Sequence, residues 1–179
     1  MQSRTPPYSS KEAFSELFED SHLLVFRYIY ALLPGPKEEV EDLTAETYWR
    51  AWRARKKFFG NLAAARGWLL KIARNLVIDT ARKHSRRGFP LNIEDIDPPY
   101  PGYSPEEKLQ LRQQVEQVIS LSGQLSLQNR EMLVLRYVLG WRVKDIGEHL
   151  DLPENTVSVA LSRSIKKIQQ SLQQDENNY

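Results

Sequence analysis

The chain has 179 residues, of which 41% are hydrophobic, so it can form packed cores in one medium-sized domain or, as fits better, in two small ones. No apolar run approaches the roughly 18 residues of a membrane span, and the first ten residues do not resemble a signal peptide, so we expect no membrane insertion and a cytoplasmic location. The absence of cysteine and the wide spacing of the three histidines predict no disulfide, no metal site and no cofactor.

Charge is distributed unevenly along the chain. Residues 11–48 contain three Lys or Arg against nine Asp or Glu, whereas residues 49–87 contain twelve against one. The formal net charge of +2 therefore hides an acidic segment beside a strongly basic one. Residues 42–52 span this change, because they begin acidic and end aromatic and basic. This pattern predicts a surface for a protein partner next to a surface for DNA.

Helical periodicity dominates the first half of the chain. Apolar residues recur at steps of three and four from Phe14 to Leu32, and Pro34-Gly35-Pro36 then forces a turn. A second helix is expected from about Glu38 to Lys57. After a short connection around Gly60, a third helix is expected from Trp68 to Lys83. No strand or hairpin pattern is present, so the predicted class is all-α.

The third predicted helix carries a polar face opposite its apolar one. At 100° per residue, Lys71, Arg74, Asn75 and Arg82 fall within an arc of about 80°. Trp68 lies nearer to this arc than to the apolar face. Cations and an amide can neutralise phosphates and read base edges, and an exposed indole can stack on an unpaired base. An ordinary solvated helix face is the alternative interpretation.

Two aromatic residues, Phe58 and Phe59, precede the predicted connection. They could pack into a three-helix core, which is the simpler interpretation. A protein that holds one DNA strand open needs aromatic faces and a pocket for an extruded base, and a loop with Phe59, Asn61 and Arg66 could provide both.

Five of the ten prolines fall between Ser85 and Pro105, where helical periodicity disappears. We interpret residues 85–105 as a linker between domains at 1–84 and 106–179. A polyproline-like conformation would let it reach roughly 65 Å, enough to place two DNA-binding domains more than one helical turn apart.

The C-terminal part contains a helix-turn-helix pattern. Val143–Leu150 form the first helix, Asp151-Leu-Pro form the turn, and a second helix runs from about Glu154 to Leu172. Gly147 is the small residue where the helices cross, and Asp151 tolerates positive φ. The second helix would present Asn155, Thr156, Ser158, Val159, Ser162 and Arg163 to a major groove, with Lys166 and Lys167 near the DNA backbone. A helix-turn-helix that does not bind DNA is the alternative.

Three stretches together resemble the extracytoplasmic-function sigma factors, which retain only regions 2 and 4. Asp42-Leu-Thr-Ala-Glu-Thr is similar to the core-binding helix of region 2, and Gly67 to Asp79 are similar to its helix that engages the minus-ten element. In region 4, Asn129 to Tyr137 are similar to the stretch before the helix-turn-helix, where Leu125 to Leu139 would form a helix pair. The resemblance covers nearly the whole chain and implies two small helical domains.

The resemblance implies a subunit that binds bacterial core RNA polymerase, recognises two promoter elements in promoter DNA, aids melting and is not itself an enzyme. Asp42 and Glu46 would meet the clamp helices of the largest polymerase subunit, with Leu43, Trp49 and Arg50 supporting that surface. The loop from Lys57 to Arg66 would hold a flipped base. The residues expected at the minus-ten element are Lys57, Phe58, Phe59, Asn61, Arg66, Trp68, Lys71, Arg74, Asn75, Arg82 and Lys83. Those expected at the minus-thirty-five element are Arg142 and Lys144 together with the residues of the second helix named above.

The chain departs from the family pattern at three positions. Ser158 and Ala160 stand where members usually carry Lys or Arg, so we expect weaker phosphate contact there and a greater dependence on Arg142, Lys144, Arg163 and Lys166. Ala45 replaces the usual glutamine and removes one hydrogen bond from the polymerase surface. An anti-sigma protein that covers the polymerase-binding surfaces is a candidate partner.

Two other functional classes are an operator-binding regulator and an enzyme. An operator-binding regulator would use the same helix-turn-helix, with residues 11–84 serving as a dimerisation or ligand module. A catalytic function is not expected, because the sequence has no glycine-rich phosphate loop, no metal-ligand spacing and no nucleophile motif.

Overall fold

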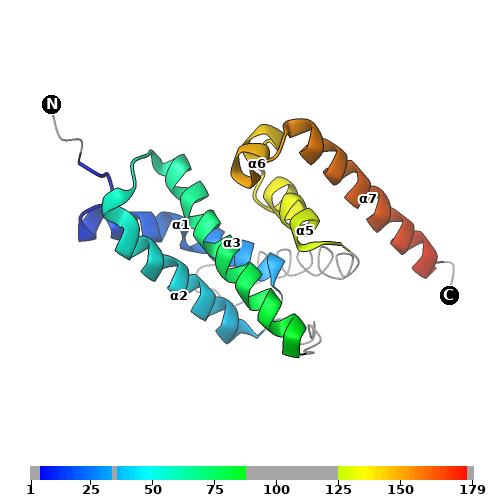
Figure 1. Ribbon diagram of the computed structural model, residues 1–179, viewed down its shortest axis with the longest axis horizontal. Coiled ribbons are helices and arrows are strands. Elements are labelled where there is room, and N and C mark those ends of the chain that lie inside the picture. The colour runs from blue at the N-terminus through cyan, green and yellow to red at the C-terminus, as the bar shows by residue number, and fades with distance from the viewer. Residues whose placement is uncertain (1–4, 34–35, 88–124, 177–179) are drawn as a thin grey trace, which may run out of the picture. The chain divides into compact units, whose positions relative to one another are not determined.

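The computed structural model describes residues 5–33, 36–87 and 125–176 (Figure 1). The chain divides into two compact units, Met1–Asn92 and Ile93–Tyr179. Within the described ranges the regular structure of both units is helical, which confirms the predicted all-α class. The proline-rich stretch from residue 88 to 105 lies outside the described residues. None of the helices described here is long and apolar enough to cross a membrane.

In the described part of unit 1, three helices pack against one another. They are α1 (Lys11–Leu32), α2 (Lys37–Ala54) and α3 (Leu62–Arg87), with a short 3-10 turn, η1 (Arg55–Lys57), after α2. Helix α1 begins where the hydroxyl of Ser10 accepts a hydrogen bond from the Ala13 amide at 3.2 Å, an ordinary N-cap.

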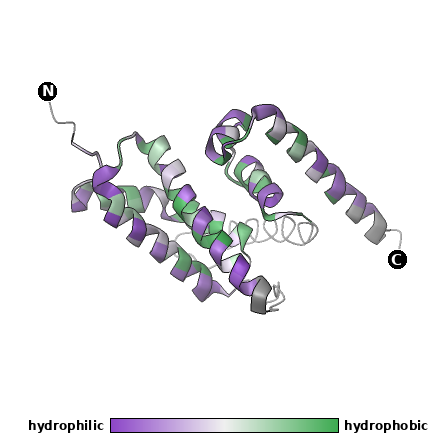
Figure 2. Ribbon diagram, in the orientation of Figure 1, coloured by the Kyte–Doolittle hydropathy of each residue, from purple (hydrophilic) through white to green (hydrophobic). Residues whose placement is uncertain are grey.

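The core of unit 1 is formed by the apolar faces that the periodicity predicts. Its fully buried side chains include Val25, Ile29, Val40, Leu69 and Val77. Each helix carries hydrophilic residues as well, as expected for helices that bury one side (Figure 2). The hydroxyl groups of Ser21 and Tyr48 lie 2.9 Å apart, which satisfies two buried polar groups between α1 and α2.

Helix α3 begins six residues earlier than predicted. The side-chain oxygen of Asn61 accepts a hydrogen bond from the Ala64 amide at 2.9 Å and caps the helix, and Leu62 is followed by three alanines, which favour helix. Arg66 therefore lies in a helix, not in the predicted loop. At its other end α3 continues to Arg87, so the domain end predicted at residue 84 falls inside a helix.

Unit 2 contains α5 (Leu127–Leu133), a π-helical turn η2 (Val134–Val138), α6 (Val143–Leu150) and α7 (Glu154–Glu176). The helix pair predicted between Leu125 and Leu139 is wrong, because α5 passes directly into η2 without a break. Neither Gly nor Pro interrupts this stretch, so nothing in it separates two helices.

The core of unit 2 joins α5, η2, α6 and α7. Leu135, Ile146 and Val157 are fully buried. A polar pair lies among them, with Nε2 of His149 3.9 Å from Oε1 of Glu131 and both side chains 2% exposed. Burial also lowers the pKa of the neighbouring Arg130 guanidinium.

The turn between α6 and α7 has the predicted geometry. Asp151 has φ of 56° and ends α6 in the left-handed conformation. The Leu152 amide donates to the Gly147 carbonyl at 2.9 Å. A Cβ atom on Gly147 would lie 2.8 Å from the Leu152 carbonyl oxygen, so the glycine is required by the backbone of the turn as well as by the approach of α7.

Candidate nucleic-acid interface

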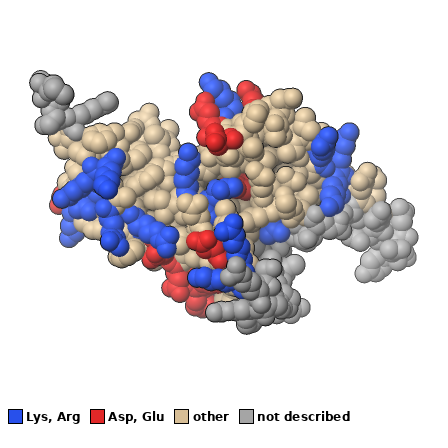
Figure 3. Space-filling model, in the orientation of Figure 1, with Lys and Arg blue, Asp and Glu red and all other residues tan. Residues whose placement is uncertain are grey.

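Helix α2 changes charge along its length. Glu38 and Glu39 lie in its first turn and Asp42 is exposed, whereas Arg53 lies in its last turn. In Figure 3, Asp and Glu gather near the start of this helix, and Lys and Arg gather over its end and η1. The charge change found in the sequence is therefore a separation of two surface regions on one helix.

The residues predicted to meet the polymerase lie together on α2. Asp42, Glu46 and Trp49 follow one another at steps of four and three, so they share one face. Glu46 accepts a hydrogen bond from Nε of Arg50 at 2.7 Å, with side chains 37% and 47% exposed. Leu43 is half-buried. Asp42 is thus the more accessible carboxylate, and the charge of Glu46 is partly balanced within the helix.

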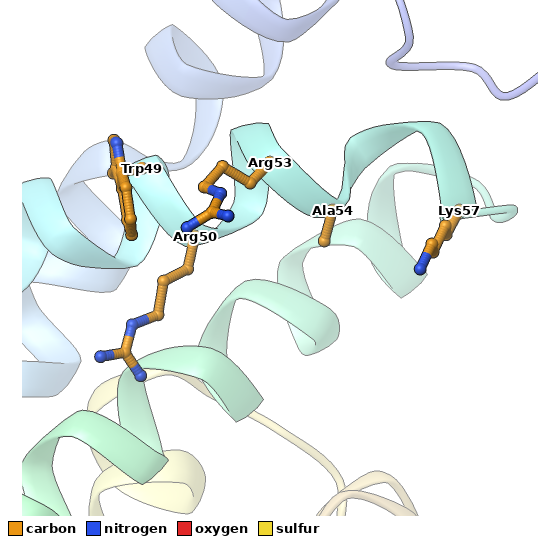
Figure 4. Close-up of a pocket in the computed structure, with 5 residues that line it drawn as sticks. All are labelled: Trp49, Arg50, Arg53, Ala54 and Lys57. Atoms are coloured by element: carbon orange, nitrogen blue, oxygen red, sulfur yellow. The ribbon is translucent and has the colours of Figure 1, made fainter.

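A pocket at the C-terminal end of α2 is lined by Trp49, Arg50, Arg53, Ala54 and Lys57 (Figure 4). Trp49 is 52% exposed, and the Arg53 guanidinium carbon lies 4.8 Å from the centre of its ring. The pocket joins residues predicted for the polymerase surface to one predicted for DNA. Arg53 was not among the predicted site residues, although its position four residues after Trp49 could have indicated it.

The two phenylalanines of the connection have different surroundings. Phe58 is half-buried and stacks on Trp68, with ring centroids 4.6 Å apart and an interplanar angle of 17°. Phe59 is 53% exposed. Core packing therefore describes Phe58 but not Phe59. Because Phe58 covers one face of the Trp68 ring, that face is not open for base stacking as the sequence suggested.

Asn61 and Arg66 have structural partners within unit 1. The Asn61 side-chain oxygen caps α3, which leaves its NH₂ group for other contacts. The Arg66 guanidinium donates two hydrogen bonds to Asp20 of α1, at 2.9 and 3.0 Å. The pKa of the nearby Tyr8 hydroxyl is raised, mainly by burial and to a smaller extent by the negative charge of Asp20. The positive charge of Arg66 acts in the opposite direction.

The polar face of α3 is accessible over several turns. Lys71, Asn75, Arg82 and Lys83 are exposed, and Arg74 is half-buried. An ion pair of 3.8 Å joins Arg82 to Asp79, with side chains 72% and 60% exposed, and such an exposed pair contributes little stability. The predicted row of cations and an amide therefore lies along one continuous helix, and most of its side chains are exposed.

The residues predicted to read DNA in unit 2 are all exposed, and the core residues between them are buried. The exposed residues are Arg142, Lys144, Asn155, Thr156, Ser158, Val159, Ser162, Arg163, Lys166 and Lys167. Val157, Leu161 and Ser164 of α7 point into the unit. Lys144 lies 3.9 Å from Glu148 in an exposed pair. Within the described residues, no group of three or more His, Cys, Asp or Glu could hold a metal ion.

Two family models match the chain. Sigma-70 region 2 matches residues 17–87, and Sigma-70 region 4 matches residues 115–168. The ECF RNA polymerase sigma factor SigL of Mycobacterium tuberculosis is 27% identical over 167 residues, which cover 93% of each chain. The ECF factor SigX of Bacillus subtilis is 22% identical and covers 91% of this chain and 85% of its own length. The chain belongs to the ECF sigma-70 family.

This ECF sigma factor shares its fold with the sigma factor RpoE of Bartonella quintana, solved with the anti-sigma factor NepR. The TM-score is 0.68 at 20% identity, and the match covers 90% of this chain and 98% of the other. As a sigma factor it directs promoter-specific transcription, with core RNA polymerase and promoter DNA as partners. Sigma factors are in general non-enzymatic regulators. The alternative of an operator-binding regulator is not favoured. It requires residues 11–84 to be a dimerisation or ligand module, whereas residues 17–87 match sigma region 2.

Proposed function

We propose that the acidic face of α2 binds the clamp helices of the largest polymerase subunit, while the basic end of α2, the following loop and α3 bind the minus-ten element. The observation that carries this assignment is the separation of charge along α2 and α3. Asp42 and Glu46 form the acidic face, and Lys57, Lys71 and Arg82 belong to the basic one. Opposite charges this close would steer one surface to a basic protein and the other to nucleic acid.

Phe59 is the best candidate for stacking on an unpaired base of the nontemplate strand. Its ring is 53% exposed and lies beside the capped start of α3, which fixes the loop. Asn61 and Lys57 flank it along the chain. We therefore place the flipped base at Phe59 and give Phe58 and Trp68 the role of supporting the loop from behind.

Phe59→Ala is expected to lower the affinity for single-stranded minus-ten DNA about fivefold or more, since base stacking on an aromatic ring contributes roughly 1–3 kcal/mol. Thermal stability should hardly change, because the ring is exposed. Phe58→Ala, which removes the supporting ring, should instead lower the melting temperature of unit 1 through loss of its contact with Trp68. Affinity is measured with fluorescently labelled minus-ten strands, and the melting temperature by circular dichroism. Equal binding by wild type and Phe59→Ala would remove Phe59 from the site.

The recognition helix α7 is assigned to the minus-thirty-five element. Removing the charge of Arg163 by Arg163→Ala is expected to weaken binding of the polymerase complex to promoter DNA and to lower the slope of log affinity against log salt by about 0.9, as for one lost phosphate contact. Glu154→Gln, which removes an exposed negative charge from the same helix, should not lower that slope. An unchanged slope in Arg163→Ala would place the residue away from the phosphates.

The division into a region 2 domain, a linker and a region 4 domain belongs to the same proposal. The region 2 match at residues 17–87, the region 4 match at residues 115–168 and the two compact units support two domains. We extend the first domain from residue 84 to Arg87, where α3 ends. We infer a cytoplasmic location from the polymerase partner and expect no catalytic activity. An anti-sigma protein is proposed as a further partner, supported by the complex of RpoE with NepR.

A further inference from the structure

The first nine residues of the recognition helix α7 contain no basic residue. From Glu154 to Ser162 the side chains are acidic, amide, hydroxyl or apolar, and the first cation is Arg163. The N-terminal residues of a recognition helix are those that reach base edges. Bidentate contact of Arg or Lys with guanine is the commonest specific contact to DNA, and this segment cannot make it. Base reading by these nine residues must therefore use other chemistry.

Val159 is an apolar side chain on the exposed side of this segment. It is 39% exposed, whereas Val157 is fully buried and Leu161 is 5% exposed. Val159 lies one helical turn after Asn155 and one turn before Arg163, and all three side chains are exposed. Its isopropyl group thus stands in the row between an amide and a phosphate-binding cation.

A single exposed valine on a protein surface is ordinary, and exposure alone would indicate nothing. Its position is informative, because β-branched residues are not favoured in helices and this one does not serve the core. In the major groove, the apolar group that a base pair offers is the C5-methyl of thymine. Asn155, one turn away, has the side chain that pairs with adenine at its N6 and N7 atoms.

We propose that Val159 is a specificity-determining residue that packs against the C5-methyl group of a thymine in the minus-thirty-five element. This inference rests on the proposed placement of α7 in the major groove. It adds that recognition there selects A·T base pairs by apolar contact, in place of guanine contacts made by basic side chains.

The test uses the full chain bound to bacterial core polymerase. A promoter is first selected from a pool of randomised duplexes by this complex. Each thymine of its minus-thirty-five element is then replaced by deoxyuridine, which removes only the methyl group and keeps all hydrogen-bonding groups. At one thymine or more, affinity should fall about fourfold, the factor for burying one methyl group. In Val159→Ala the thymine and deoxyuridine duplexes should bind equally, while Gln169→Ala, at an exposed position beyond the assigned residues, should keep the difference.

The remaining outcomes contradict the inference in distinguishable ways. If deoxyuridine has no effect at any thymine, or if Val159→Ala keeps the effect, Val159 does not read a methyl group. If the selected minus-thirty-five element contains no A·T pairs, Val159 likewise does not read a thymine methyl group. In these cases a loss of affinity on scrambling the element would leave the placement of α7 intact. If scrambling has no effect, the assignment of α7 to this element fails, and the inference fails with it.

Discussion

Reversing the charge of Asp42 and Glu46 together, by Asp42→Arg and Glu46→Arg, is expected to weaken binding to core RNA polymerase at least about a hundredfold, because like charges placed opposite each other cost several kcal/mol. Asp42 is exposed and Glu46 is half-buried, so both can meet a partner without rearrangement. The change also frees Arg50 from its bond to Glu46, which makes the surface still more positive.

The control for this variant is Glu16→Arg with Glu19→Arg, which makes the same change in net charge at exposed positions of α1. Affinity for fluorescently labelled core polymerase is measured for both double variants at one salt concentration, with circular dichroism to confirm that both are folded. An equal loss in the two would mean that net charge, not the α2 face, controls binding. Full binding by the α2 variant would move the polymerase contact elsewhere.

Gly147→Ala is expected to destabilise unit 2 by roughly 1–3 kcal/mol, the usual cost of overpacking. The added Cβ would lie 2.8 Å from the Leu152 carbonyl oxygen, a backbone atom that cannot move without opening the turn. The sign of this change in stability is informative, because Gly→Ala at a helical glycine without such a contact would increase stability by up to about 1 kcal/mol. Loss of the turn would also misplace α7.

The measurement is hydrogen exchange at the amides of α6 and α7, compared with the amides of α1 in the same protein. Protection should fall in unit 2 and stay unchanged in unit 1, since the two units have separate cores. Increased protection in α6 would mean that the turn accepts the methyl group and that Gly147 is not required there.

Much of unit 1 can be predicted from the sequence, since its helices bury one regular face each. The periodicity from Phe14 to Leu32 predicts α1 closely. The start of α3 is harder, because Asn61 is equally compatible with a loop and with a cap. The partner of Arg66 is Asp20, 46 residues earlier in the chain, and no local pattern indicates such a contact.

The functional surfaces also differ in how far the sequence predicts them. The exposed row on α7 follows from helical spacing, because the buried positions Val157 and Leu161 fix which side faces out. Phe58 and Phe59 are identical in type and adjacent, so composition cannot tell which one packs inside. Contact with Trp68 decides it, and this contact depends on where α3 begins.

The most direct test of this account is run-off transcription from the selected promoter with core polymerase and three forms of the protein. The forms are wild type, the Asp42→Arg, Glu46→Arg variant, and a Lys71→Glu, Arg82→Glu variant of the exposed α3 face. We predict that wild type initiates at one start site, that the α2 variant fails to assemble with polymerase, and that the α3 variant assembles but does not initiate. An α3 variant that loses polymerase while the α2 variant retains it would contradict the assignment of the two faces.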